Sequence, residues 1–167
     1  MKDQLIREAR RLEEDSLYSS KGHWEAAAWW SRVHLGLGLL ATVLAGTAGA
    51  AALGDYAQWA GGLALAGAAV TGIMTFLNPD QRAMLHQTAG NRFNSIKNRT
   101  RFFREIDIDL GRSEQELVEQ LRQLRCEYER VRGDSPLIPR WAYCLAKQGI
   151  ARGEATYDVD SDAMADK

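Results

Sequence analysis

Two uninterrupted apolar segments constrain this chain more than any other feature of its sequence. Residues 33–53 (VHLGLGLLATVLAGTAGAAAL) and 57–77 (AQWAGGLALAGAAVTGIMTFL) are each 21 residues long, and neither contains Asp, Glu, Lys or Arg. At 1.5 Å per residue, a helix of this length measures roughly 30 Å, which matches the hydrocarbon core of a bilayer. The sequence therefore predicts two transmembrane helices.

The connection and the flanks of these segments predict their arrangement. Only Gly54, Asp55 and Tyr56 separate the two segments, so the helices must run antiparallel as a hairpin with both termini on one side. Lys and Arg are absent from this turn, whereas Lys21, Arg32 and a basic cluster between positions 82 and 104 flank the outer ends. The excess of positive charge favours the cytoplasm for both termini.

Two other interpretations of the apolar segments fit the sequence less well. A cleaved signal peptide would have an n-region of 32 residues with six acidic side chains, and a second apolar segment would follow it. A soluble bundle that hides the hairpin in its core would need several amphipathic helices to cover it on all sides. The rest of the chain offers only three or four such helices, so we favour the membrane hairpin.

Four aromatic residues fall near the ends of the apolar segments, where lipid headgroups are expected: Trp29, Trp30, Tyr56 and Trp59. Amphipathic rings are enriched at this depth of a membrane. For Trp29 and Trp30, packing on a neighbouring helix is an equally good interpretation.

Small residues recur at every fourth position of both apolar segments. They are Gly38, Thr42, Gly46 and Ala50 in the first segment, and Ala60, Ala64, Ala68 and Gly72 in the second. Small side chains let membrane helices approach closely, so we expect these stripes to mediate helix packing and self-association into a homo-oligomer. One stripe could instead seal the hairpin to itself, and composition alone could produce both.

The polar residues inside the second segment are few. Thr71, Thr75 and Asn78 share one helix face, and they either line a hydrated seam as pore-lining residues or hydrogen-bond across the helix pair. Neither segment contains Asp, Glu, Lys or Arg. A proton relay, an ion-coupled transporter or a voltage sensor needs such charge, so the sequence argues against these classes.

The remaining sequence predicts helices and no strand. We expect an amphipathic helix over residues 1–32, a basic juxtamembrane helix over 79–106, a heptad-like helix over 113–132, a C-terminal helix and motif within 136–157, and a disordered acidic tail over 158–167. Asn78 and Pro79 mark a helix start, and Ser113 with Glu116 forms a capping box. The expected fold is all-α: a two-helix transmembrane hairpin with long cytoplasmic helices packed in a bundle.

The heptad-like helix has an apolar seam that needs a partner. Its members follow each other at alternating spacings of four and three: Leu117, Leu121, Leu124, Tyr128 and Val131. The seam is too short for a free coiled coil. It pairs either with the N-terminal helix of the same chain, through Leu5, Ile6 and Leu12, or with another protomer.

The segment directly after the hairpin is basic. Residues 80–105 carry six basic and two acidic side chains, a net charge of +4, whereas residues 106–167 carry nine basic and thirteen acidic side chains. We expect Arg92, Lys97, Arg99 and Arg101 to contact lipid headgroups, and the alternative is a solvated face.

No catalytic or metal-binding pattern is present. Cys126 and Cys144 are far apart and predict free thiols, and His23, His34 and His86 stand alone. The sequence has no Walker loop and no nucleophile elbow. We therefore expect a non-enzymatic protein that needs no cofactor or metal and does not bind nucleic acid directly.

Several stretches around the hairpin together resemble the SLATT family of bacterial two-helix membrane proteins. The resemblance covers about residues 12–158. The residues that carry it are Leu12-Glu13-Glu14-Asp15-Ser16, Tyr18 and His23; Phe76-Leu77-Asn78-Pro79, Arg82, His86, Gly90 and Asn91-Arg92; and Pro136, Pro139-Arg140-Trp141, Gly149 and Gly153-Glu154-Ala155-Thr156-Tyr157.

The resemblance implies an inner-membrane effector of an antiviral conflict system. Such proteins are thought to oligomerise on an infection signal and breach the inner membrane, which arrests or kills the cell (abortive infection). Partners implied by the resemblance are a nucleotidyltransferase, a reverse transcriptase or a SLOG sensor encoded nearby. The alternative function is a membrane-tethered adaptor that holds a cytoplasmic helical module where a signalling partner docks.

Overall fold

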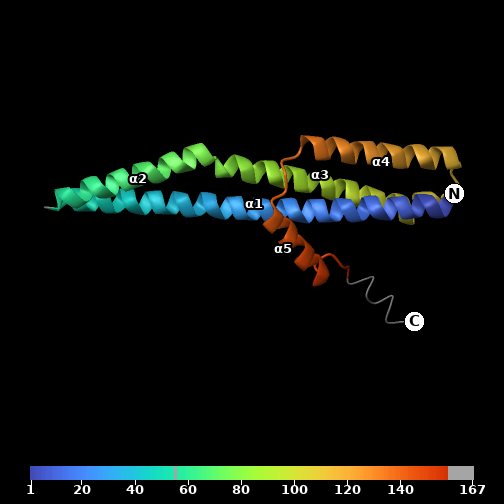
Figure 1. Cartoon of the computed structure of the whole chain (residues 1–167), viewed down its shortest axis with the longest axis horizontal. Helices are drawn as coiled ribbons and strands as arrows, with labels where there is room; N and C mark the ends of the chain where they lie inside the picture. Colours follow the sequence, from blue (N-terminus) through green and yellow to red (C-terminus); the bar gives the residue numbers. More distant parts are fainter. Residues whose placement is uncertain (55, 158–167) are drawn as a thin grey trace. The chain divides into compact units, whose positions relative to one another are not determined.

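The computed structural model describes residues 1–54 and 56–157, and the protein is all-α over these residues. Figure 1 shows the elements in chain order: α1 (Lys2–Leu53), α2 (Ala57–Leu77), α3 (Pro79–Glu105), the 3-10 helix η1 (Asp107–Asp109), α4 (Glu114–Asp134) and α5 (Arg140–Ala151). No strand occurs in the described ranges, which confirms the predicted fold class. The predicted disordered tail, residues 158–167, lies outside them.

Most predicted helix boundaries agree with the structure. The second apolar segment is α2 without change, and Pro79 opens α3. The predicted helices over 1–32 and 33–53 are one continuous helix, α1, and neither Gly nor Pro stands at the junction between them. Asn78 ends α2 and directly precedes α3: it has left-handed backbone angles (φ 44°, ψ 56°), its N–H donates to the Met74 carbonyl at 3.0 Å, and its carbonyl accepts from the Arg82 N–H at 3.2 Å.

The capping box at the start of α4 is confirmed. The Ser113 hydroxyl accepts from the Glu116 backbone N–H at 3.3 Å, and the Glu116 carboxylate accepts from the Ser113 N–H at 3.0 Å. These bonds satisfy amide groups that the first turn of a helix otherwise leaves without partners. The bond from the Ser113 N–H to the carboxylate, and then a side-chain hydrogen bond of Ser113, lower the pKa of Glu116, because they favour the charged carboxylate.

The chain forms two compact units. One, which we call the bundle unit, consists of Met1–Ala26 together with the chain from Leu85 onward. The other, the hairpin unit, is Ala27–Met84. Each is described separately below.

The core of the bundle unit joins α1, α3 and α4. The whole predicted seam of α4 is buried, and it packs in one cluster with Leu5, Ala9 and Leu12 of α1. The seam therefore pairs with the N-terminal helix of the same chain, as one of the two alternatives predicted. From α3 the cluster takes Phe93, Ile96 and Phe103. Burying a large apolar side chain stabilises a fold by about 1.5–3 kcal/mol, so this cluster holds the three helices together.

The hairpin unit is held together by an apolar seam between α1 and α2. Gly67 is its buried centre: a Cβ atom built there would lie 3.5 Å from the Leu44 Cβ and 4.0 Å from the Ala41 carbonyl oxygen. The least exposed residues around this point recur at alternating spacings of three and four, and they are Leu37, Ala41, Leu44, Ala48 and Ala51 in α1 and Ala60, Leu63, Gly67, Val70 and Met74 in α2. This spacing is the one by which two helices pack side by side.

The outer surface of the hairpin unit is apolar and uncovered. Leu35, Leu65 and Phe76 are 72%, 75% and 91% exposed. Among residues 1–54 and 56–157, two helices are long and apolar enough to cross a membrane, and only 6% of the apolar window of each is buried. A helix in the core of a soluble protein is mostly buried, whereas most of each of these apolar windows is exposed.

Candidate functional site

The small-residue stripes lie mostly on the outside of the hairpin. Ala64 and Ala68 of the second stripe are exposed, whereas its end members Ala60 and Gly72 are half-buried. In the first stripe, the exposed members are Thr42, Gly46 and Ala50. Gly38 is half-buried, and a Cβ built there would lie 4.0 Å from the Met74 Cε.

The hairpin is therefore sealed by the Gly67 seam, which of the second stripe includes only Ala60. Gly67 was missed at the sequence level, although the alternating spacing of Ala60, Leu63, Gly67, Val70 and Met74 was present in the sequence. The outward faces of both stripes remain open to a further helix.

The polar residues of α2 bond within their own chain segment. The Thr71 hydroxyl donates to the Gly67 carbonyl and the Thr75 hydroxyl to the Thr71 carbonyl, each at 2.9 Å. The Asn78 side-chain amide donates to the Gln81 Oε1 at 2.5 Å. These donors do not bridge α1 and α2. All three residues are exposed.

Aromatic rings lie near both ends of the helix pair. Trp29 and Trp30 form an edge-to-face pair with ring centroids 4.7 Å apart, and the Arg82 guanidinium lies 5.0 Å from the Trp30 ring. Tyr56 and Trp59, near the connection, are 66% and 72% exposed. Exposed amphipathic rings at both ends of an apolar helix pair are the pattern of residues at a membrane–water interface.

Three of the four predicted headgroup-binding residues contact protein groups. Arg99 is ion-paired with Glu127 of α4. Lys97 Nζ donates to the Tyr157 hydroxyl at 3.3 Å, and the Arg101 guanidinium lies 4.5 Å from the centre of the Tyr157 ring. Arg92 is exposed and makes no side-chain hydrogen bond or ion pair within the described residues. These contacts fasten the end of the described chain to α3.

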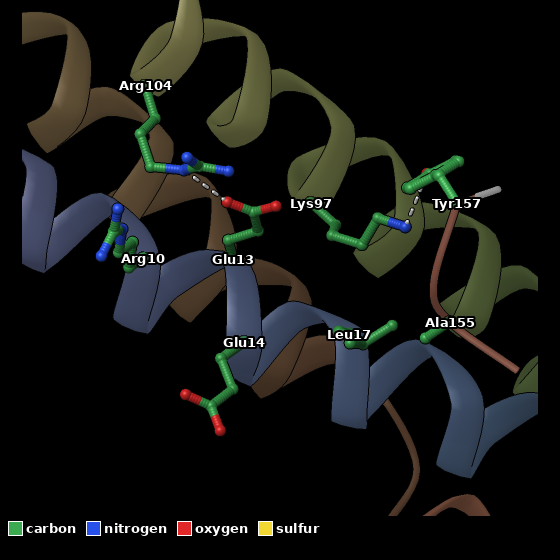
Figure 2. Close-up of a pocket in the computed structure, with 8 residues that line it drawn as sticks. All are labelled: Arg10, Glu13, Glu14, Leu17, Lys97, Arg104, Ala155 and Tyr157. Atoms are coloured by element: carbon green, nitrogen blue, oxygen red, sulfur yellow. Dashed lines mark hydrogen bonds and ion pairs between the residues drawn. The ribbon is translucent and has the colours of Figure 1, made fainter. Parts of the chain in front are cut away.

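A hollow of about 420 Å³ opens beside these contacts in the bundle unit. Figure 2 shows its lining, which combines cationic, anionic and aromatic side chains from α1, α3 and the residues after α5: Arg10, Glu13, Glu14, Leu17, Lys97, Arg104, Ala155 and Tyr157. Glu13 points toward Arg104, whereas Glu14 points away from α3.

The Glu13–Arg104 pair fixes α1 against α3 at this hollow. The Arg104 Nε donates to the Glu13 carboxylate at 2.9 Å, and both side chains are 21% exposed. Burial lowers the pKa of Arg104, but the hydrogen bond and charge of Glu13, together with Glu105, outweigh burial and raise it. The guanidinium therefore stays charged, and the hollow presents fixed charges of both signs.

Two histidines meet in the interior of the bundle unit. His23 of α1 and His86 of α3 are 2% and 5% exposed, and their Nδ1 atoms lie 2.9 Å apart. His23 also stacks on Phe93, with ring centroids 5.5 Å apart. Burial, and then the nearby His86, lower the pKa of His23 to about 4. Sequence reasoning treated both histidines as isolated because 63 positions separate them.

Nothing in residues 1–54 and 56–157 resembles a metal centre. No group of three or more His, Cys, Asp or Glu side chains is placed there to hold an ion. Cys126 and Cys144 are exposed free thiols, as predicted.

Comparison with known proteins identifies no relative for this arrangement. No protein-family model matches the chain, and neither a curated protein nor a solved structure is significantly similar to it. The resemblance to the SLATT family therefore stays a prediction from the residues quoted above.

Proposed function

We propose that this protein is a membrane effector of a bacterial antiviral conflict system, anchored in the inner membrane by α1 and α2. On activation it oligomerises through the hairpin, forms a pore or otherwise disrupts the membrane, and arrests or kills the infected cell. In this proposal the protein acts without catalysis or a cofactor.

The observation that carries the membrane anchor is the bare apolar surface of the hairpin unit. Exposing side chains such as Leu35, Leu65 and Phe76 to water is unfavourable by about 25 cal/mol per Å² of apolar area. A bilayer removes this cost over both helices at once. The aromatic rings near both ends and the absence of charged side chains from both segments support the same environment.

The charge distribution supports an orientation with both termini in the cytoplasm. Arg32 and Arg82 flank the apolar segments within the hairpin unit, whereas Lys and Arg are absent from positions 54–56. Positive charge is retained on the cytoplasmic side during insertion.

Self-association is supported by the outward stripes. In lipid, burying apolar side chains adds little, so association depends on close packing. Because the Gly67 seam already seals the hairpin, Ala64 and Ala68 are free for contact with another protomer.

The antiviral role rests on the SLATT resemblance. It supplies the expectation that a nucleotidyltransferase, a reverse transcriptase or a SLOG sensor encoded nearby delivers the signal. The hollow between α1 and α3, with its fixed charges, is available to receive a signal on the bundle unit.

The test is controlled overproduction in bacteria with a dye that reports membrane potential. We expect growth arrest together with depolarisation. The matched control is the bundle segments without the hairpin, with residues 27–84 replaced by a flexible linker. Normal growth and a normal potential at full membrane abundance would contradict the effector function.

A second function, a membrane-tethered adaptor, is favoured by the bundle unit. This unit has a core of its own, built from three helices, and a charged hollow that a signalling partner could engage. An adaptor would leave the membrane potential unchanged on overproduction, so the same experiment separates the two functions.

A further inference from the structure

The short helix α5 presents apolar side chains on the outside of the bundle unit. Leu137, just before α5, is 93% exposed, and Trp141 and Leu145 are 38% and 47% exposed. Trp141 and Leu145 are four positions apart and share one face of the helix. An exposed face of this kind marks an interaction surface.

The charge around this face is of one sign. From Pro136 to Arg152 the chain carries Arg140, Lys147 and Arg152 and no acidic residue. Within the described residues these three side chains form no hydrogen bond or ion pair. The basic residues Arg122 and Arg125 of α4 differ, because they are paired with Glu119 and Glu129.

We propose that α5 is a second, peripheral membrane contact that lies on anionic lipid headgroups. Leu137, Trp141 and Leu145 enter the boundary between headgroups and acyl chains, and Arg140, Lys147 and Arg152 bind lipid phosphates. An amphipathic helix with apolar and aromatic residues on one side and basic residues beside them binds a membrane surface in this way. Long basic side chains reach the headgroups while their stems lie along apolar surface.

The other face of α5 is fixed to the bundle unit, so the helix is held in one orientation. Ala142, Ala146 and Gly149 are buried. Ile138 packs closely on Gly22, where a Cβ atom would lie 3.1 Å from the Ile138 Cγ2. Lys21 pairs with Glu154 at 3.5 Å. Gly22 precedes the first apolar segment by only eleven positions in the sequence.

A lipid surface fits this face better than a second copy of the chain. A symmetric contact between two copies would bring three unpaired cations against three others, with no acidic residue of α5 between them. Anionic headgroups neutralise the same charges. The predicted basic cluster on α3 is a weaker candidate, because Lys97, Arg99 and Arg101 already contact Tyr157 or Glu127.

The test uses the native thiols of the full-length chain in vesicles. Cys144 lies on α5 and Cys126 on α4, and both are exposed. C126S and C144S variants each leave one thiol for an environment-sensitive fluorophore, and L65C in the doubly substituted chain reports on the hairpin. Vesicles contain phosphatidylglycerol and phosphatidylethanolamine with nitroxide-labelled lipids as quenchers.

We expect lipid quenching at Cys144 and at L65C, and none at Cys126. Replacing phosphatidylglycerol with phosphatidylcholine, or raising the salt to 1 M, should remove the quenching at Cys144 and leave L65C unchanged, because salt screens charges beyond about 3 Å. Reversing Arg140, Lys147 and Arg152 to Glu should do the same. The matched control reverses Arg122, Arg130 and Arg132 of α4, and quenching should persist.

The inference rests on the proposed membrane anchor, and different quenching results would overturn the contact of α5 and the anchor. Quenching at L65C alone would overturn the contact of α5 and leave the anchor. Quenching at neither position would overturn both. A fluorophore at Cys144 that is shielded from water at high protein-to-lipid ratio, but is never quenched by lipid, would assign the face to a second copy and overturn the proposal.

Discussion

The Nδ1 atoms of His23 and His86 lie 2.9 Å apart in the interior of the bundle unit. Only one hydrogen fits between them, so one imidazole donates and the other accepts. Two neutral rings can supply this donor and this acceptor. If both rings were protonated, two Nδ1–H donors would face each other. The pair joins α1 to α3 where both helices are buried.

This pair predicts that stability falls in mild acid. The pKa of His23 is about 4 in the folded protein, below its ordinary value of 6.5, so between these values the unfolded chain binds more protons. Stability is therefore complete above about pH 6.5 and is lost as the pH falls toward 4, by up to about 3 kcal/mol. Urea unfolding of the detergent-solubilised chain from pH 7.5 to 4.5 measures this slope. In H23Q the slope should be smaller, and an unchanged slope would assign it to other groups.

Gly90 lies at a position where adding a single methyl group should lower the stability of the protein. A Cβ atom there would lie 2.6 Å from the Trp24 Cδ1 and 3.2 Å from the Ser20 carbonyl oxygen. Trp24 cannot move freely, because its indole N–H donates to the Asn91 Oδ1 at 3.1 Å. We expect G90A to destabilise the protein by about 1–3 kcal/mol in the same unfolding measurement.

The matched control for Gly90 is Gly133, which also lies in a helix. A Cβ atom at Gly133 meets nothing within 4 Å. G133A should be neutral or stabilise the protein by up to about 1 kcal/mol, because Ala has the higher helix propensity. Equal effects of the two variants would show that the contact with Trp24 carries no cost.

The features that the sequence predicted depend on residues close together in the chain, whereas the missed contact joins residues far apart in the chain. The apolar segments, the Ser113 capping box and the buried seam of α4 follow from residues a few positions apart. The contact between His23 and His86 depends on the folded path of the chain, which no short-range pattern contains. Leu85 shows the limit within a helix: it lies four and eight positions before the buried Ala89 and Phe93 of α3, yet it is 50% exposed.

The small-residue stripes do not form the packing seam between α1 and α2, and the reason is geometric. Four residues turn an α-helix by slightly more than one full turn, so each step of four rotates the stripe by about 40°. From Ala60 to Gly72 the stripe therefore winds away from α1. Alternating steps of three and four stay in line, which is why Gly67 and not Ala64 faces Leu44.

Gly67 predicts a substitution that opens the hairpin. G67A should be tolerated, since its Cβ makes ordinary contact with Leu44 at 3.5 Å, whereas G67L would drive a branched side chain into α1. Cysteines at positions 38 and 74, with C126S and C144S, report the distance between α1 and α2 by oxidative crosslinking. The crosslink should form in G67A and be strongly reduced in G67L. Equal yields would show that another contact sets the spacing.

The outward stripe of α2 predicts a variant that separates assembly from insertion. A64L combined with A68L would push a neighbouring protomer's helix away and remove many small dispersion contacts. Insertion should not suffer, because Leu is more hydrophobic than Ala. The hairpin should also survive, because Ala64 and Ala68 are exposed and the Gly67 seam is unchanged.

We expect the A64L/A68L protein to reach the membrane at normal abundance, run as a smaller species after crosslinking and no longer halt growth when overproduced. The paired cysteines at 38 and 74 provide the control, since their crosslink should persist. Toxicity that remains after assembly is lost would mean that single hairpins damage the membrane. Assembly that survives would contradict the role of this face and leave the outward part of the first stripe, Thr42, Gly46 and Ala50, as the surface by which protomers meet.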